Sequence, residues 1–479
     1  MRQSLSDRLN NFHHGLAVDV EPRAEGHLTR LIGMTLEAVG LNVSVGQQCE
    51  VSMGRGKTVE AEVVGFADDK VYLMPVRRIE GLQPGATVKP LSTHCGIRIG
   101  PDMLGRVING LGQPLDGKGA ITGDDFLEFT PHDINPLQRK PISEPLDVGI
   151  RAINSLITVG RGQRLGLMAG SGVGKSVLLG MMTKFTAADV VVVGLIGERG
   201  REVKEFIDHI LGEEGLRRSV VVASPADDAP LMRLRAAELS TRVAEYYRDQ
   251  GKNVLLLMDS LTRYGQAQRE VALAIGEPPA TKGYPPSVFA KIPALVERAG
   301  NADEGQGSIT AFYTVLTEGD DLQDPIADAA RAILDGHIVL SREMADEGIY
   351  PAINVEGSIS RAMQNIVVPK HLKAAQRFKQ LLSNYRQNKD LITIGAYKPG
   401  ADPDTDVAIE RQPHLKQFIQ QSLDESVKYG ESCKALQQVL VSTTTQTTMG
   451  QRGDPNQPQM QMQGQAQMQP QNSSQTTSQ

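Results

Sequence analysis

The chain has 479 residues and 40% of them are hydrophobic, which is enough for more than one domain with a buried core. The formal net charge of −6 and the absence of tryptophan argue against a basic, aromatic-lined surface for nucleic acid. The three cysteines form no CxxC pair and we identify no signal peptide or membrane-spanning run, so we expect a soluble cytoplasmic protein without a zinc site or disulfide framework.

The first twenty residues place apolar side chains at helical spacing. Leu5, Leu9, Phe12 and Leu16 lie on one stripe of a helix. Because a polar, proline-containing segment follows, residues 1–20 are predicted to form a helix that binds a partner protein. A helix that docks on its own domain would have the same pattern.

Residues 21–95 contain short predicted strands separated by turn residues. The segment 58–64 alternates apolar and charged side chains, which is typical of a strand with one buried face. Glycine and aspartate pairs mark turns at close intervals along this region. The pattern predicts a small β-barrel.

The next region, residues 96–369, alternates apolar strands with helical stretches and predicts a parallel sheet in an α/β domain. The expected strands include 163–168, 189–196, 220–223, 253–259, 308–315 and 337–340. Residues 370–442 are predicted to be helical. The Gln-, Met- and Thr-rich residues 443–479 cannot bury enough apolar area to fold, so they are predicted to form a disordered tail.

A glycine-rich segment, Ala-Gly-Ser-Gly-Val-Gly-Lys-Ser, runs from Ala169 to Ser176 between an expected strand and an expected helix. This arrangement cradles phosphates with backbone N–H groups, although Ala169 stands where the motif usually has its first glycine. Lys175 can reach the β- and γ-phosphates, and the Ser176 hydroxyl can bind Mg²⁺. The predicted nucleotide contacts are Gly170, Ser171, Gly172, Val173, Gly174, Lys175, Ser176 and Val177.

Two carboxylates follow or end buried strands and are expected to lie beside this motif. Asp259 ends the expected strand 253–259 and is predicted to hold Mg²⁺ or its waters. Glu198 follows another strand and is predicted to orient the attacking water, with Glu202 and Glu205 as alternatives on the next helix. A surface ion pair between Glu198 and the adjacent arginine is the plainer alternative.

The segment from Tyr350 to Arg361 supplies two more candidates. Arg361 follows a turn of small residues and could project to a neighbouring subunit, where a guanidinium would stabilise charge on the γ-phosphate. Tyr350 offers a flat face for adenine. Taken alone, Arg361 would more often be a structural or surface arginine, and Tyr350 an aromatic side chain of the core.

Together these segments resemble the catalytic subunits of rotary ATPases, the family of the F-type ATP synthase beta subunit. Within that family they are most similar to the flagellum-specific ATPases of flagellar type III protein export. The similarity runs from about residue 20 to residue 440, and it is densest in residues 139–149, 169–176, 195–206, 259–264 and 351–360. It implies a RecA-like P-loop domain between the barrel and the helical region.

The resemblance also implies a mechanism, in which six copies form a ring and bind ATP and Mg²⁺ between neighbours. Lys175 holds phosphate, Glu198 activates water, and Arg199 lies near the γ-phosphate. Asp259, together with the Ser176 hydroxyl, supports the metal, and Arg361 acts on the neighbouring subunit as an arginine finger. Non-catalytic sister subunits of the family carry Gln at the position of Glu198, so the sequence is typical of a catalytic subunit.

The same resemblance implies that Tyr350 and Phe418 contact adenine. It implies a stator-like regulator on the N-terminal helix, a coiled-coil stalk protein in the ring pore, export-gate membrane proteins, and export substrates with their chaperones. The expected place is the cytoplasmic side of the inner membrane beneath the flagellar basal body. The alternatives are a virulence-type secretion ATPase, an ATP synthase catalytic subunit and a regulatory ring subunit. An RNA-acting ring helicase is disfavoured by the acidic composition.

Overall fold

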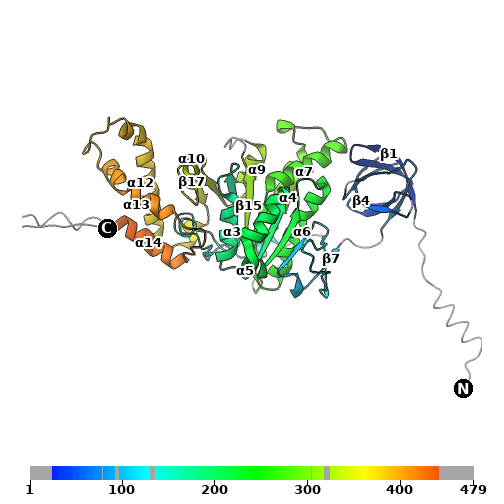
Figure 1. Ribbon diagram of the computed structural model, residues 1–479, viewed down its shortest axis with the longest axis horizontal. Helices are drawn as coiled ribbons and strands as arrows, with labels where there is room; N and C mark the ends of the chain where they lie inside the picture. The colour runs from blue at the N-terminus through cyan, green and yellow to red at the C-terminus, as the bar shows by residue number, and fades with distance from the viewer. Residues whose placement is uncertain are drawn as a thin grey trace, which may run out of the picture. The chain divides into compact units, whose positions relative to one another are not determined.

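The computed structural model describes residues 24–54, 56–77, 79–91, 96–129, 135–303, 305–317 and 324–441. The predicted N-terminal helix and the predicted disordered tail lie outside the described residues, as does Cys95. The described residues form three regions, which are a barrel, an α/β domain and a helical region (Figure 1).

The first region is a closed barrel of six antiparallel strands in the order β1-β2-β5-β4-β3-β6. The strands are β1 (Gly26–Ile32), β2 (Thr35–Val39), β3 (Gln48–Ser52), β4 (Thr58–Ala67), β5 (Lys70–Pro75) and β6 (Thr87–Pro90). The alternation along β4 buries Val59, Ala61 and Val63 in the barrel core. The predicted β-barrel is confirmed.

The central region is built on a largely parallel sheet with the order β17-β16-β10-β15-β13-β11-β12-β8, and β14 pairs with β15. The strands are β8 (Arg106–Ile108), β10 (Arg164–Ala169), β11 (Val190–Ile196), β12 (Ser219–Ser224), β13 (Asn253–Asp259), β14 (Gly300–Asn301), β15 (Ser308–Leu316), β16 (Gly336–Leu340) and β17 (Ile353–Ser360). The six strands expected from apolar runs are all present. Only β14 and β17 run antiparallel to their neighbours in this sheet.

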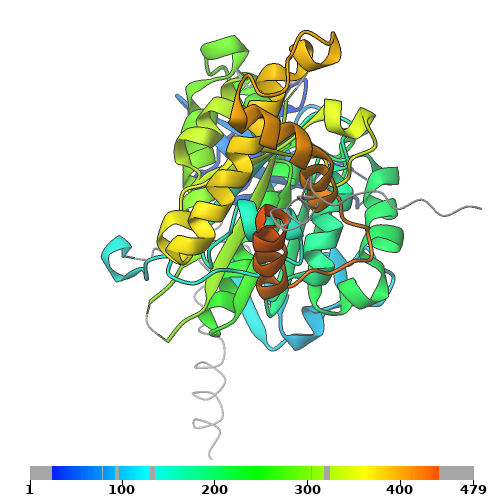
Figure 2. The same ribbon diagram turned by 90° about the vertical axis from the view of Figure 1, so that its left-hand side faces the viewer.

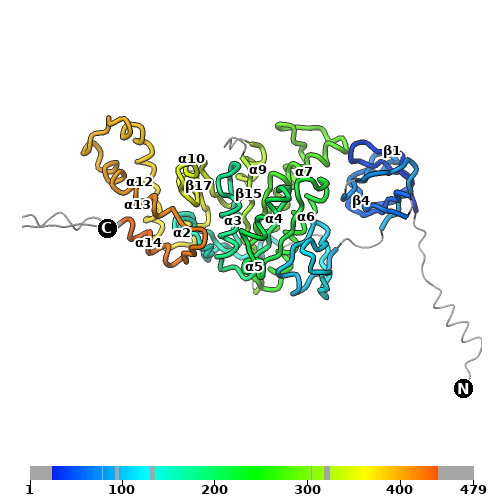
Figure 3. Tube along the Cα trace, in the orientation of Figure 1, coloured from blue at the N-terminus to red at the C-terminus, as the bar shows by residue number. Residues whose placement is uncertain are grey.

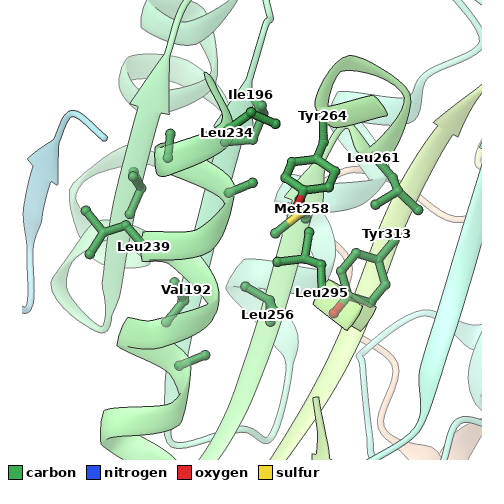
Figure 4. Close-up of a cluster of buried hydrophobic side chains, with 14 of the residues drawn as sticks. Val192, Ile196, Leu234, Leu239, Leu256, Met258, Leu261, Tyr264, Leu295 and Tyr313 are labelled. Carbon is green, nitrogen blue, oxygen red and sulfur yellow. The ribbon is translucent and has the colours of Figure 1, made fainter. Parts of the chain in front are cut away.

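Helices pack on both faces of the sheet, because every second side chain of a strand points to the same face. Val192 of β11 joins Leu256 and Met258 of β13 in one core, whereas Val191 and Val193 belong to the core on the other face. Figure 4 shows the first of these cores, with Leu234 and Leu239 of α6 packed against the strands. The predicted α/β domain is confirmed.

The helices of the α/β region are α2 (Arg151–Leu156), α3 (Lys175–Phe185), α4 (Gly200–Glu205), α5 (Gly212–Arg217), α6 (Pro230–Asp249), α7 (Leu261–Ala274), α8 (Pro286–Glu297), α9 (Pro325–Ile333), α10 (Arg342–Asp346) and α11 (Met363–Ile366). Short 3₁₀ turns lie at Pro101–Met103, Pro136–Gln138 and Thr281–Gly283, and a π-helical stretch, Phe206–Leu211, follows α4. A two-stranded sheet pairs β7 (Gly96–Ile99) with β9 (Asp125–Glu128).

The C-terminal region is helical, as predicted, and consists of α12 (Pro369–Thr393), α13 (Pro403–Ile419) and α14 (Tyr429–Val441). α12 and α13 pack side by side, and Figure 2 shows them in yellow and orange. Figure 3 follows the chain from β17 through these helices. None of the helices in the described ranges combines the length and hydrophobicity that a membrane span requires.

Candidate active site

The glycine-rich segment forms the turn between β10 and α3 at the carboxyl edge of the sheet. Gly172 and Gly174 have φ values of 78° and 88°, a region that residues with a Cβ atom rarely adopt. The turn opens on a cavity of about 950 Å³. Seven of the eight predicted nucleotide contacts line this cavity, namely Gly170, Ser171, Gly172, Gly174, Lys175, Ser176 and Val177. The Val173 side chain is instead buried in the core.

The Lys175 ammonium lies between two of the predicted carboxylates. Its Nζ is 2.6 Å from Oδ1 of Asp259 and 3.2 Å from Oε1 of Glu198. This convergence follows from the sheet order, because β11 and β13 are parallel neighbours and their carboxyl ends meet at one edge. The structure therefore brings three predicted residues together, two of them from separate strand ends.

Burial and charge shift the proton affinities of these groups. Burial, together with the carboxylate of Asp259, raises the pKa of the Glu198 carboxyl to about 7, although the Lys175 ammonium acts in the opposite direction. Burial lowers the pKa of Lys175, but the carboxylates of Asp259 and Glu198 outweigh this effect and raise it. A carboxyl group with a pKa near neutrality can exchange a proton at working pH, as a catalytic base must.

Arg199, Glu202 and Glu205 also line the cavity. The Arg199 side chain is 78% exposed, and its Nη1 lies 3.6 Å from Oε1 of Glu202. Glu198 pairs with Lys175 rather than with Arg199, so the surface ion pair considered from the sequence is not the one formed within the described ranges. Both alternative bases lie on α4, as expected.

Tyr350 lies against the glycine-rich turn without lining the cavity. Its side chain is 43% exposed, and its ring carbons are about 3.4 Å from where a Cβ atom of Gly174 would stand. Phe418 on α13 is only 4% exposed, and its ring lies 5.2 Å from that of Phe378, centroid to centroid. Gln421, just after α13, connects this helix to Tyr350, because its backbone N–H donates to the Tyr350 carbonyl oxygen at 3.0 Å.

Arg361 follows β17 at the edge of the sheet and does not line the cavity of its own chain. Its backbone N–H donates to the Asp335 carbonyl oxygen at 2.9 Å. The residue is exposed, and its side chain forms no ion pair with any other described residue. The structure does not bring this predicted residue to the glycine-rich turn of the same chain.

Two residues that line the cavity, and one buried behind Asp259, had no role assigned from the sequence. Arg342 donates from Nη2 to the Ser171 carbonyl oxygen at 3.1 Å, and Arg263 lies in the first turn of α7, shortly after Asp259. Thr314 on β15 donates from Oγ1 to Oδ1 of Asp259 at 2.6 Å. The sequence offered a signal for the arginines, since both stand just after the carboxyl ends of strands. One threonine within an apolar strand carries no such signal.

The part of the chain that the structure describes holds no cluster of three or more His, Cys, Asp or Glu side chains arranged for a metal ion. Any ion at this site would need further ligands from a bound phosphate, which is the usual arrangement for Mg²⁺ in nucleotide sites.

Family models match three parts of the chain. Residues 28–92 match the beta-barrel domain of the ATP synthase alpha/beta family, and residues 149–360 match its nucleotide-binding domain. Residues 367–438 match the C-terminal domain of the type III secretion ATPase EscN.

Among curated relatives, the flagellum-specific ATP synthase of Pseudomonas aeruginosa is 65% identical over 92% of this chain and 98% of its own length. The flagellum-specific ATP synthase of Salmonella typhimurium is 57% identical over 89% of this chain and 96% of its own. The type 3 secretion system ATPase of Xanthomonas euvesicatoria is 46% identical over 87% of this chain and 94% of its own.

Solved structures agree with these relatives. The assembled ATPase EscN of the enteropathogenic E. coli type III secretion system has a TM-score of 0.82 and 43% identity, over 87% of this chain and all of that one. EscN in complex with its central stalk EscO has a TM-score of 0.79 with 42% identity, over the same shares. A barrel, a P-loop α/β domain with its Lys175 and Asp259 pair, and a secretion-type helical region thus occur in one chain. The chain belongs to the ATP synthase alpha/beta family, on its flagellum-specific and type III secretion branch, and it is a P-loop ATPase.

Proposed function

We propose that this chain hydrolyses ATP with Mg²⁺ in a ring of six copies and that hydrolysis supports export of flagellar proteins through a type III apparatus. The observation that carries the proposal is the meeting of Lys175, Glu198 and Asp259 beside the glycine-rich turn. Identity of 65% to a flagellum-specific relative supports the flagellar assignment over the virulence type, whose relative is 46% identical. The secretion-type C-terminal domain favours export over ATP synthesis.

Glu198 is the residue that we assign to the attacking water. This carboxylate lies two residues after the end of β11 and lines the cavity, and its pKa of about 7 allows it to accept a proton. In-line attack on a γ-phosphate needs an acceptor that orients the water opposite the leaving oxygen. Lys175 would turn from the carboxylates to the phosphates when ATP binds, and Arg199 would lie near the γ-phosphate.

Ser176 and Asp259 are the residues that we assign to Mg²⁺. Hydroxyl and carboxylate oxygens are the donors that this ion prefers. Oδ2 of Asp259 accepts no hydrogen bond from any described residue, and Ser176 lines the cavity, so no described group competes with an ion for that carboxylate oxygen. When bound, the ion neutralises charge on the phosphate oxygens.

The trans role of Arg361 rests on its exposure and on its not lining the cavity of its own chain. An arginine at a subunit edge can reach the nucleotide of a neighbour, where it stabilises charge in the transition state. Tyr350 remains the predicted adenine contact. Phe418 was predicted to contact adenine as well, but its ring is nearly buried, so we assign it to packing beneath the adenine site rather than to direct stacking.

The partners proposed are a central stalk, as the solved EscN–EscO complex suggests by analogy, a regulator at residues 1–20, export-gate proteins, and substrates with chaperones. A position at the cytoplasmic face of the inner membrane, beneath the flagellar basal body, follows from these partners. Removal of residues 1–16 should abolish capture of the regulator and leave the fold unchanged, which a pull-down with circular dichroism would check.

Expression in a bacterium that lacks its own flagellum-specific ATPase tests the proposed function. The wild-type chain should restore secretion of hook and filament proteins, whereas Glu198→Gln should not. Purified protein should hydrolyse ATP without stimulation by poly-ribonucleotide. Robust ATPase activity without restored secretion would contradict the export role, and stimulation by RNA would favour the helicase alternative.

A further inference from the structure

Thr314 is a hydroxyl-bearing residue within an otherwise apolar part of the sheet. It lies on β15, between β10 and β13, in the run Phe312, Tyr313, Thr314, Val315. Its side chain is fully buried. Because Tyr313 pairs in register with Met258, Thr314 lies beside Asp259 at the carboxyl end of β13.

The Thr314 hydroxyl is committed to Asp259. Oγ1 donates to Oδ1 of Asp259 at 2.6 Å, and its distance to the Met258 carbonyl oxygen is longer, 3.4 Å. The same Oδ1 also accepts from Nζ of Lys175 at 2.6 Å. Within the described ranges Oδ2 accepts no hydrogen bond, so both donors hold one oxygen of the carboxylate and leave the other unused.

Nucleotide binding should affect the two donors, Lys175 and Thr314, differently. Lys175 also contacts Glu198 and belongs to the turn that binds phosphate, so it leaves Asp259 when it reaches a bound phosphate. Thr314 sits on a buried central strand and stays. The Asp259 side chain is only 4% exposed, and a buried carboxylate that loses every donor is strongly destabilised.

We propose that Thr314 is a positioning residue, whose hydroxyl holds Oδ1 of Asp259 so that Oδ2 stays directed to the metal after Lys175 moves to the nucleotide. The proposal rests on the proposed assignment of Asp259 to Mg²⁺. It predicts that the hydroxyl, rather than the shape of the side chain, determines the metal affinity of the nucleotide complex.

The test measures Mn²⁺ affinity by electron paramagnetic resonance in the complex with a non-hydrolysable ATP analogue. Thr314→Val keeps the shape and removes the hydroxyl, and it should weaken Mn²⁺ binding roughly ten- to a hundred-fold, the range for a hydrogen bond to a charged group. Thr314→Ser should stay within about three-fold of wild type, because it keeps the donor. If Thr314→Val does not fold, Thr314→Ala should show the same loss.

Thr310→Val is the matched control. Thr310 is buried on the same strand, and its hydroxyl accepts from the Gly162 N–H at 2.9 Å, away from Asp259. It should lower thermal stability and leave Mn²⁺ affinity unchanged. Wild-type metal affinity in Thr314→Val would overturn the inference. If Asp259→Asn also bound Mn²⁺ normally, the metal assignment itself would fail, so the two failures are distinguishable.

Discussion

Glu198 lies where burial and a neighbouring anion oppose the attraction of an ammonium. Burial and Asp259 raise the pKa of its carboxyl, and Lys175, at 3.2 Å, acts against them. The outcome is a carboxyl that holds its proton at a higher pH than an ordinary surface glutamate does.

Glu198→Gln should bind Mg–ATP and lose hydrolysis by roughly 10²–10⁴-fold, the range for a positioned acid–base group. The amide keeps the size of the side chain but cannot accept the proton of water. Binding is measured with a fluorescent ATP analogue and turnover by phosphate release.

Glu205→Gln is the matched control, because Glu205 lines the same cavity on α4. It should stay within about three-fold of wild type, since its carboxylate is not the assigned base. Near-wild-type turnover in Glu198→Gln, with loss in Glu205→Gln, would show that Glu205 on α4 is the base instead.

The acid limb of the pH profile should report Glu198. Its pKa is raised to about 7, so lowering the pH below 7 adds the proton that blocks the base. Because kcat/KM reports the free enzyme, its value should fall about ten-fold per pH unit well below the midpoint. Measurement between pH 5 and pH 9 checks this, and a midpoint near the ordinary glutamate value, roughly 4.3, would contradict it.

The meeting of Lys175, Glu198 and Asp259 could be predicted from sequence, because carboxyl ends of neighbouring parallel strands share an edge. The contact of Thr314 with Asp259 could not, because it depends on the register between β13 and β15. The near-complete burial of Phe418 was also out of reach, since packing against Phe378 is decided by tertiary structure.

Gln421, which follows α13, connects this helix to the start of α2 through hydrogen bonds. Its Oε1 accepts from the Arg151 N–H at 2.7 Å, and its Nε2 donates to the Gly149 carbonyl oxygen at 2.8 Å. Its backbone N–H also holds the Tyr350 carbonyl oxygen. These bonds connect the C-terminal helices with the residue that we expect to contact adenine.

Gln421→Ala should lower the free energy of unfolding by about 1–3 kcal/mol, because it leaves buried backbone groups without partners. It should also raise the KM for ATP, because without the side-chain hydrogen bonds the Gln421 backbone N–H, which donates to the Tyr350 carbonyl oxygen, is no longer fixed in place. Urea denaturation and steady-state kinetics check both effects.

Gln420→Ala is the neighbouring control, because Gln420 is exposed. It should change neither quantity beyond about 0.5 kcal/mol or two-fold. Equal effects of the two substitutions would show that the Gln421 hydrogen bonds do not join these elements.

The sequence predicted the long apolar strands of the sheet well, because continuous valine and leucine runs are typical of strands buried on both faces. β13 has the predicted limits, and β11 differs by one residue. The short strand β8 and the antiparallel edge strand β17 had no comparable signal. Their positions depend on pairing with neighbours that are distant in sequence.

In the proposed ring, two neighbouring copies share one active site. The cradle residues lie around one cavity, whereas Arg361 is exposed at the sheet edge without a described ion-pair partner. Because the arginine and the base then come from different copies, the active site of an isolated copy is incomplete. Specific activity should therefore rise with protein concentration as rings assemble.

A mixture of the Glu198→Gln and Arg361→Ala proteins tests whether the site is shared. Glu198→Gln keeps the arginine finger, and Arg361→Ala keeps the base, so each alone should form rings and hydrolyse ATP poorly. In rings that assemble from an equal mixture, about a quarter of the interfaces combine an intact base with an intact finger, and activity should return towards that fraction of wild type. Mixed rings that are confirmed by sizing but no more active than either variant alone would contradict a shared site.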